Sequence, residues 1–283
     1  MAVFEIIKLT GNLKKYLSIG LVFCFLSIAY SLYELPDDKF HLYFFDVDQG
    51  DSIFIKTPQN HKILIDGGPR DFVLEELGKV MPFFDKEIDF IVLTHPHADH
   101  LEGLVEVLNR FKVKMVLISG VNTSNDTYKE FLLECSNKNI PIQIAERKND
   151  FLFGNTTLDV LYPFKSIVGE DYDNLNNSSI GINVLFENKQ IILLGDLEKE
   201  KETDLLKYPL PKRVDIYKAS HHGSRTASSI EFLKRITPKE VVIQAGKDNK
   251  FKHPHPETIR NFYRINVEKI HRTDADGSIE FIF

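Results

Sequence analysis

The sequence predicts a mixed α/β fold of the α+β class, in which two β-sheets pack against each other with helices on their outer faces, preceded by one apolar N-terminal helix. Three observations indicate this fold. An uncharged stretch occupies residues 16–33. After it, short apolar runs typical of strands alternate with amphipathic segments typical of helices. Each half of this region opens with a group of strands, which favours two packed sheets covered by helices over a single sheet.

The composition is that of a globular protein with few cysteines. The chain has 283 residues, of which 43% are hydrophobic and 27% charged, and its formal net charge is -6. That charge argues against a protein that coats duplex DNA through its overall charge. The two cysteines, Cys24 and Cys135, lie in different predicted helices, and no Cys-x-x-Cys motif is present. Histidines and carboxylates would therefore have to hold any bound metal.

Residues 16–33 are expected to form a membrane anchor. A helix of this length spans about 27 Å, which is sufficient for the hydrocarbon core of a bilayer. Lys8, Lys14 and Lys15 precede it, and acidic residues follow it. The positive-inside rule then places residues 1–15 in the cytoplasm and the rest of the chain outside.

The same segment has an alternative reading as a cleaved signal peptide. Ser27-Ile28-Ala29 would be the small-x-small cleavage site, and the protein would then be secreted. In either case residues 34–39 form a short linker, and residues 40–283 form the folded domain.

The first half of that domain has the following expected elements. Runs of β-branched and aromatic residues predict strands, and apolar residues at helical spacing, such as Val73, Leu77 and Val80, predict helices. The expected strands are 41–47, 51–57, 62–68, 89–95, 113–119 and those around 140–146 and 158–163. The expected helices are 72–81, 101–111 and 127–137.

The second half repeats this organisation. Residues 179–196 read as a hairpin with its turn at residues 187–189. The other expected strands are 214–224, which runs into a loop, 240–246, 267–273 and 277–283. The expected helices are 200–208, 228–236 and 256–265.

The stretch "LTHPHADHLEGL" carries the strongest chemical signal. His95 and His97 follow an apolar strand, and Asp99 and His100 begin the next helix, where a carboxylate also favours the positive helix N-terminus. Imidazole nitrogens and carboxylate oxygens are ligands that suit Zn²⁺ and Mn²⁺. The pattern therefore predicts a metal site where the strand ends.

This H-x-H-x-D-H pattern resembles the signature of the metallo-β-lactamase superfamily. Further motifs appear in the family's order over most of residues 40–283: "LIDGG" with Asp66, "ILLGDLE" with Asp196, and "KASHHGS" with His221 and His222. The resemblance implies an αββα metallo-β-lactamase sandwich with one or two metal ions along one edge. It also implies that Asp196 bridges the two ions.

A narrower resemblance links the chain to the C-terminal hydrolase domain of ComEC-type DNA-uptake (competence) channels and its stand-alone relatives. The motifs "FFDVDQGDSIFI", "HHGS", "HPHPE" and "HRTDADGSIEF" carry it, together with those above. Asp48 replaces a glycine in the usual D-V-G-Q-G-D pattern, which puts a carboxylate near the rim of the site. The channel spans are absent from this chain, so membrane transport is not expected of it.

The resemblance also implies the metal ligands. The superfamily's usual additional histidine is missing, because no histidine lies between His100 and His221, and "NLNNSSIGI" stands in its place with Asn176, Asn177 and Ser179. The expected ligands of site one are His95, His97 and Asp196. Those of site two are Asp99, His100, Asp196 and His222. Site two is expected to bind more tightly, and Zn²⁺ and Mn²⁺ both suit such a set.

Some neighbouring residues are expected to support the ligands or the reaction. His222 takes the ligand position in the H-x-S pattern, and His221 then contacts the leaving group or orients a ligand; the reverse assignment is the alternative. Asp99 and His253 are further catalytic candidates, His253 by contacting a phosphate oxygen, although it also reads as a surface residue of a rigid loop. The candidates for orienting ligands or contacting substrate are Asp51, Asp66, Asn176 and Ser179.

The expected function is a metal-dependent hydrolase facing outward from the membrane. The resemblance implies a phosphodiesterase or nuclease acting on single-stranded or fragmented nucleic acid, with one or two Zn or Mn ions lowering the pKa of an attacking water. One alternative substrate is a small phosphoester or a lactone. A non-catalytic DNA-uptake accessory module is the other alternative, and it would be expected to have an eroded set of metal ligands.

Overall fold

The computed structural model describes residues 2–33 and 37–283, with side chains described for residues 13–30 and from residue 37 onward. The chain divides into two compact units, Met1–Asp37 and Asp38–Phe283. Each unit is treated separately below.

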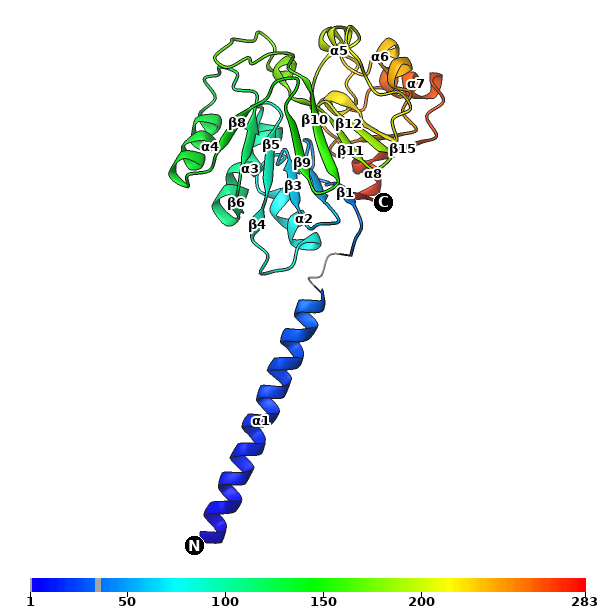
Figure 1. Ribbon diagram of the computed structural model, residues 1–283. Helices are drawn as coiled ribbons and strands as arrows, with labels where there is room; N and C mark the ends of the chain where they lie inside the picture. The colour runs from blue at the N-terminus through cyan, green and yellow to red at the C-terminus, as the bar shows by residue number, and fades with distance from the viewer. Residues whose placement is uncertain (1, 34–36) are drawn as a thin grey trace. The chain divides into compact units, whose positions relative to one another are not determined.

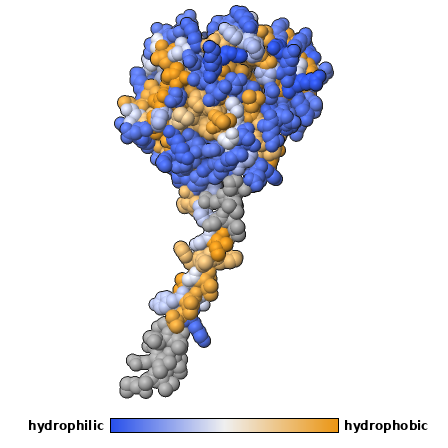
Figure 2. All heavy atoms as spheres, viewed as in Figure 1, coloured by the Kyte–Doolittle hydropathy of each residue, from blue (hydrophilic) through white to orange (hydrophobic). Residues whose placement is uncertain are grey.

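The first unit is a single long helix, α1 (Ala2–Tyr33). Its segment Leu13–Tyr30 has a mean hydropathy of 1.4 and no buried residues. Figure 2 shows apolar side chains along this helix, whereas the visible face of the second unit is mainly hydrophilic. Among the described residues this is the one helix long and apolar enough to cross a membrane, and its position near the N-terminus also fits a signal sequence.

The second unit contains two seven-stranded sheets (Figure 1). The first sheet has the order β16 (Ile279–Ile282), β1 (His41–Phe44), β2 (Ile53–Lys56), β3 (Lys62–Ile65), β5 (Phe90–Leu93), β7 (Val116–Ile118), β8 (Ile142–Ile144). The second sheet has the order β15 (Lys269–Arg272), β14 (Glu240–Ile243), β13 (Ile216–Lys218), β12 (Lys189–Leu193), β11 (Gly181–Phe186), β10 (Thr156–Tyr162), β9 (Asp150–Phe153).

Both sheets combine antiparallel and parallel pairing. In the first sheet β16, β1, β2 and β3 pair antiparallel, and β3, β5, β7 and β8 pair parallel. In the second sheet β9 to β12 pair antiparallel, and β12 to β15 pair parallel. Loops that leave the carboxyl ends of parallel strands are the usual place for a ligand site in such sheets.

Three apolar layers hold the unit together. One lies between the two sheets and includes Phe44, Val92 and Leu193. The second packs the first sheet against α2 (Phe72–Val80), α3 (Ala98–Arg110) and α4 (Asp126–Asn137). The third packs the second sheet against α5 (Lys199–Leu205), α6 (Ile230–Ile236) and α7 (Pro256–Arg264). The result is an αββα sandwich, which confirms the predicted fold class.

Three elements differ from the sequence expectation. The expected strand 113–119 is divided between β6 (Lys112–Val113), which pairs with β4 (Glu87–Ile88), and β7. Strand β9 was not expected; it forms a hairpin with β10. The last two strands join different sheets, because the short helix α8 (Thr273–Asp276) separates them and β16 returns to β1. Pairing partners far along the chain decide the first and the third difference, whereas β9 pairs with the strand that follows it.

Two glycines let the loop after β3 approach helix α3. Gly67 N donates to His100 O at 2.8 Å, and Gly103 N donates to Gly68 O at 3.0 Å. A Cβ atom on Gly103 would lie 2.0 Å from Gly67 O, which is too close for any side chain. This contact brings Asp66, which precedes Gly67, beside His100 at the start of α3.

Substituting Gly103 by alanine is therefore expected to destabilise the domain. Overpacking of this kind costs about 1–3 kcal/mol in unfolding free energy. Gly78 is a matched control in α2, because a Cβ there meets nothing within 4 Å, and Gly78→Ala should be neutral or stabilise by up to about 1 kcal/mol through helix propensity. Denaturant unfolding of both variants measures the difference, and equal stability of the two would contradict the close contact.

Candidate metal centre

The candidate site lies where loops from both sheets converge. The contributing loops follow the parallel strands β3, β5, β12 and β13, each at its carboxyl end. These loops carry Asp66, His95 to His100, Asp196 and His221 to His222. Residues widely separated in sequence thus meet at one edge of the sandwich.

The histidine-rich stretch bridges β5 and α3. His95 lies after the strand, His97 is the N-cap residue of α3, and Asp99 and His100 are in its first turn. The helix begins here because His100 N and Leu101 N donate to His97 O at 3.1 and 3.0 Å. His95 and His100 are fully buried, whereas Asp99 remains partly exposed.

Asp66 fixes this stretch from the neighbouring strand. Its Oδ1 accepts a hydrogen bond from Thr94 N, and its Oδ2 accepts one from Thr94 Oγ1, both at 2.7 Å. Oδ2 also lies 2.7 Å from His100 Nδ1. Burial raises the pKa of Asp66, although the bonds from His100 and Thr94 partly offset that effect. Asp66 therefore orients the His100 ring so that Nε2 faces away from it.

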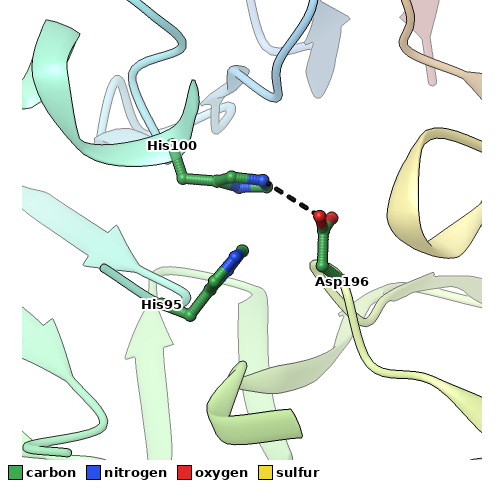
Figure 3. Close-up of side chains that lie close together, drawn as sticks. All are labelled: His95, His100 and Asp196. Carbon is green, nitrogen blue, oxygen red and sulfur yellow. Dashed lines mark ion pairs between the residues drawn. The ribbon is translucent and has the colours of Figure 1, made fainter. Parts of the chain in front are cut away.

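Asp196 faces His100 from the second sheet. Its loop follows β12, and Asp196 N donates to Ser179 Oγ at 3.1 Å. Figure 3 shows the carboxylate of Asp196 pointing at His100, with His95 beside them, and His100 Nε2 lies 3.4 Å from Asp196 Oδ2. Ser179, a sequence candidate for orienting the ligands, thus contacts the backbone of Asp196 through its side-chain hydroxyl.

His222 completes the set from the loop after β13. Both His221 and His222 have left-handed backbone conformations, with φ of 51° and 53°. His222 Nε2 lies 3.3 Å from Asp99 Oδ2 and 3.4 Å from Asp196 Oδ2. Its Nδ1 lies 3.1 Å from both Asp51 Oδ1 and the backbone oxygen of Gln244. The geometry favours His222 over His221 as the ligand, because only His222 is held from behind by a buried carboxylate.

These four side chains have the spacing of a metal-binding set. Metal bonds of about 2.0–2.1 Å place the ligands of a tetrahedral Zn²⁺ roughly 3.3–3.4 Å apart, and the three contacts above are 3.3 to 3.4 Å. His100 Nε2 and His222 Nε2 are buried, and within the described part of the chain neither has a hydrogen-bond partner. Buried polar atoms of this kind call for a ligand. Asp99, His100 and His222 form one group whose ligand atoms lie within 4.8 Å of one another, and Asp196 adjoins both histidines from the second sheet.

A second ion would have fewer ligands. His95, His100 and Asp196 form another group whose ligand atoms lie within 4.8 Å of one another. His97 belongs to none of the four such groups found among the described residues; its Nδ1 lies 2.9 Å from His95 Nε2. Of the ligands expected for site one, His95 and Asp196 thus lie in one group of ligand atoms. His97 contacts His95 but lies outside that group.

His221 lies at the partly exposed side of the centre. Its Nε2 is 3.8 Å from Asp196 Oδ2 and 3.5 Å from Asn176 Nδ2. Its Nδ1 lies 3.2 Å from Glu198 Oε1 and from Thr226 Oγ1. Glu198 was not singled out from the sequence, although it ends the quoted "ILLGDLE" motif. A carboxylate next to a glycine-aspartate motif could have suggested such a partner.

His253 is buried next to His221 and His222, with an exposed fraction of 9%. The centroid of its ring lies 5.5 Å from that of His221 and 6.2 Å from that of His222. Burial, followed by the positive charges of His222, His221 and His255, lowers the pKa of His253 to about 3. The interpretation of His253 as a surface loop residue is therefore wrong, because the loop folds inward and packs its ring against the centre.

Lys218 is a buried member of the centre that the sequence did not reveal. It is fully buried at the end of β13 and forms an ion pair with Asp51 Oδ2. Its Nζ also lies 4.0 Å from Asp196 Oδ1. Asp51 thus connects Lys218 to His222, and Lys218 neutralises part of the carboxylate charge behind the metal ligands.

Burial and neighbouring charges shift the pKa values of the buried histidines and aspartate in opposite directions. Burial alone would lower the pKa values of His100 and His222, but Asp196 with Asp66 or Asp51 raises both well above the ordinary value. Burial alone would raise the pKa of Asp196, but His222 and His100 hold it well below its usual range. The carboxylates therefore stabilise positive charge at His100 and His222, and a bound divalent ion would take the place of the protons on these two rings.

Asp48, the residue that departs from the family pattern, lies at the rim. It has a left-handed backbone with φ of 65°, which a glycine adopts readily and an aspartate tolerates. Its side chain is exposed and lies 3.6 Å from Arg70. Asp48 therefore adds a partly neutralised carboxylate near the mouth and no ligand to the groups described above.

Comparison with known proteins places these features in a family. Residues 45–247 match the family model described as the metallo-beta-lactamase superfamily. The chain is 28% identical over 287 residues to "ComE operon protein 3" of Bacillus subtilis (strain 168), covering 95% of this chain and 36% of that protein. It is 25% identical over 259 residues to "Competence protein ComA" of Neisseria gonorrhoeae, covering 90% and 34%. The chain thus spans about a third of the length of these relatives.

Solved structures share the fold. The metallo-beta-lactamase fold protein YhfI from Bacillus subtilis superimposes with a TM-score of 0.58 at 11% identity, covering 87% of this chain and 100% of that one. The metallo hydrolase Igni18 from Ignicoccus hospitalis superimposes with a TM-score of 0.53 at 17% identity, covering 87% and 99%. At these identities the comparison supports the architecture alone.

Removing His100 is expected to abolish more metal binding than removing His97. His100 belongs to three of the groups of ligand atoms, and His97 belongs to none of them. Elemental analysis after dialysis should therefore find His97→Ala close to the parent, His95→Ala intermediate and His100→Ala nearly metal-free. A His97→Ala protein that retains as little metal as His100→Ala would reverse the assignment.

Lys218→Met is expected to destabilise the fold by about 3–5 kcal/mol, because the buried Asp51 carboxylate loses its lysine partner and keeps the contact with His222. The double variant Asp51→Asn/Lys218→Met removes both charges and should lose less than the sum of the single losses. The exposed pair Lys112–Glu87 provides a control, since Lys112→Met should change stability by less than about 0.5 kcal/mol. Additive losses in denaturant unfolding without metal would show that the buried pair is not coupled.

Proposed function

The chain belongs to the metallo-beta-lactamase superfamily, and we propose that residues 40–283 form a metal-dependent phosphodiesterase that acts on nucleic acid. The observation that carries the proposal is the set formed by buried His100, Asp196 and His222 with partly exposed Asp99, in which three contacts between ligand atoms are 3.3 to 3.4 Å. An eroded binding module would not be expected to keep such a set, because retaining unpaired buried nitrogens costs stability.

The metal ions would be Zn²⁺ or Mn²⁺, one held by Asp99, His100, Asp196 and His222 and a second beside His95 and Asp196, with His97 next to it. When bound, such ions lower the pKa of a water molecule and stabilise negative charge on phosphate oxygens. Ser179 and Asp66 hold Asp196 and His100 in place. Asp51 and Lys218 do the same for His222.

Two groups at the open side of the centre are suited to proton transfer. Asp99 has a side chain 31% exposed and can accept a proton at Oδ1 or Oδ2 from the attacking water. His221 is 21% exposed, and Glu198 beside Nδ1 leaves Nε2 directed toward the centre. We assign to His221 Nε2 the hydrogen bond or proton that the leaving oxygen requires, and His253 supports it from the adjacent loop.

The choice of a phosphodiester is supported by the relatives and by the site. The printed name of one matched protein, "Competence protein ComA", refers to competence, which favours nucleic acid as the substrate. Divalent ions bound beside Asp196 would favour an anionic phosphate over a neutral lactone. A small phosphoester is the second candidate and shares the same chemistry at phosphorus.

The N-terminal helix α1 is proposed to anchor the enzyme in the membrane, with residues 1–15 in the cytoplasm and the catalytic unit outside. Its length and hydropathy support this. A reporter active only outside the cytoplasm, fused after residue 40, should give signal, and a cytoplasmic reporter at the same position should not. Release of the fusion from the membrane fraction would favour a cleaved signal peptide.

Asp196→Asn is expected to reduce phosphodiester hydrolysis by at least about 10²-fold, the scale for losing one key electrostatic group. The amide keeps the shape but is a weaker, neutral ligand. The apolar strand β12 anchors the loop independently of the carboxylate, so circular dichroism should be unchanged.

The assay compares parent and variant on single-stranded DNA, RNA and bis-p-nitrophenyl phosphate with Mn²⁺ or Zn²⁺. Parent-level turnover by the variant would rule out the proposed centre, and metal binding without any turnover by the parent would favour the accessory-module alternative.

A further inference from the structure

The loop between β14 and α7 is built as a rigid edge of the metal centre. Asn249 Nδ2 donates to Gly246 O at 2.9 Å and to His253 O at 2.7 Å, and Asn249 Oδ1 accepts from His253 N at 3.0 Å. The end of the loop is bonded to the histidine loop, because His255 N donates to Gly223 O at 3.0 Å. These hydrogen bonds therefore hold the loop in a fixed position relative to His222.

Three rings form a continuous stack from solvent to the metal ligand. Phe251 is 48% exposed, His253 is 9% exposed and His222 is 1% exposed. Phe251 and His253 are stacked with centroids 5.7 Å apart and an interplanar angle of 22°, and His253 and His222 are 6.2 Å apart at 27°. An exposed phenylalanine that ends such a stack provides an apolar surface parallel to the rings beneath it.

The same loop gathers positive charge. Lys247, Lys250 and Lys252 are all exposed, and Asp248 is the one acidic residue among them. In the described parts of the chain none of the three lysines forms an ion pair, and Lys250 Nζ lies 4.9 Å from the centroid of Phe251. Lys250 lies over the ring of Phe251, so a base that stacks there would displace the ammonium toward its own phosphate. In a chain with a net charge of -6, three lysines without ion pairs within four residues of one exposed aromatic ring form a local site for an anion with a planar group.

We propose that residues 247–253 form a stacking shelf for single-stranded nucleic acid, in which one base packs on Phe251 and the adjoining phosphates contact the lysines. The inference rests on the proposed function and extends it by naming the loop that selects a single strand and the residue that holds one base. A base can stack on Phe251 only when its face is free, as in a single strand. The phosphate next to that base would then lie toward His253 and the metal centre.

Binding without metal tests the shelf separately from hydrolysis. The full chain in detergent, with EDTA, is titrated with a fluorescent oligothymidylate of about twelve nucleotides, and anisotropy gives the Kd. Phe251→Ala should weaken binding by about 5- to 150-fold, the range for losing one stacked base. Phe251→Tyr should restore it. Phe83→Ala, which removes a ring that is 87% exposed in another loop, is the matched control and should bind like the parent.

Two further titrations separate stacking from charge. An oligomer of the same length without bases should bind the parent and Phe251→Ala equally, because nothing remains to stack. Lys250→Gln/Lys252→Gln should reduce the slope of log K against log salt by about 1.4, near 0.7 for each lost contact with a single strand.

The outcomes are distinguishable from those of the proposed function. Equal Kd values for the parent and Phe251→Ala on oligothymidylate, or duplex binding as tight as single-strand binding, would overturn the shelf even if the enzyme hydrolyses phosphodiesters. A loss at Phe251 that Tyr restores, in a protein that hydrolyses nothing, would uphold the shelf and overturn the proposed enzyme.

Discussion

The burial of carboxylates at the junction of the two sheets is the constraint on which the site depends. Asp51, Asp66 and Asp196 are each no more than 2% exposed, and Lys218 is the fully buried lysine placed among them. Buried charge is tolerated only when it is paired or binds a metal. His100 and His222 supply the remaining partners, and the carboxylates raise their affinity for a positive charge. A centre in which buried carboxylates outnumber the buried lysine is suited to divalent cations. The loops hold these carboxylates and histidines next to one another.

The fold meets that constraint by bringing loops from both sheets to one edge. Gly67 and Gly103 allow the backbone after β3 to touch α3, so that Asp66 reaches His100. Gln244, at the end of β14, donates to Phe45 O and Ser52 O in the first sheet, at 2.9 and 2.8 Å. Its own backbone oxygen lies 3.1 Å from His222 Nδ1. The packing of the sandwich and the orientation of the ligands are thus held by the same contacts, and a change in one is expected to affect the other.

The exposure of the side chains increases from the buried centre to the surface, and the roles for which these side chains are suited change along the same path. The buried side holds ligands in fixed orientations, as Lys218 and Asp51 do for His222. The partly exposed side carries groups suited to moving protons, such as His221 with Glu198. Beyond these, Phe251 and its neighbouring lysines face solvent. Such a gradient allows tight binding of a metal ion and recognition of a large substrate within one continuous site.

The fold class, most of the strands and helices, the apolar N-terminal helix, and the histidine and aspartate motifs could all be predicted from the sequence, because each depends on local periodicity or spacing. Which of these groups meet could not be predicted, because that depends on contacts between distant segments. Asp51 and Lys218 are 167 positions apart in sequence, and the pairing of Glu198 with His221 depends on two loops of the second sheet. The inward position of His253 and the ring stack that ends at Phe251 likewise follow from how one loop packs against another. The local pattern of a segment shows which of its side chains become buried. Which other segments those side chains contact depends on the order of the strands and on the loops that the two sheets bring together.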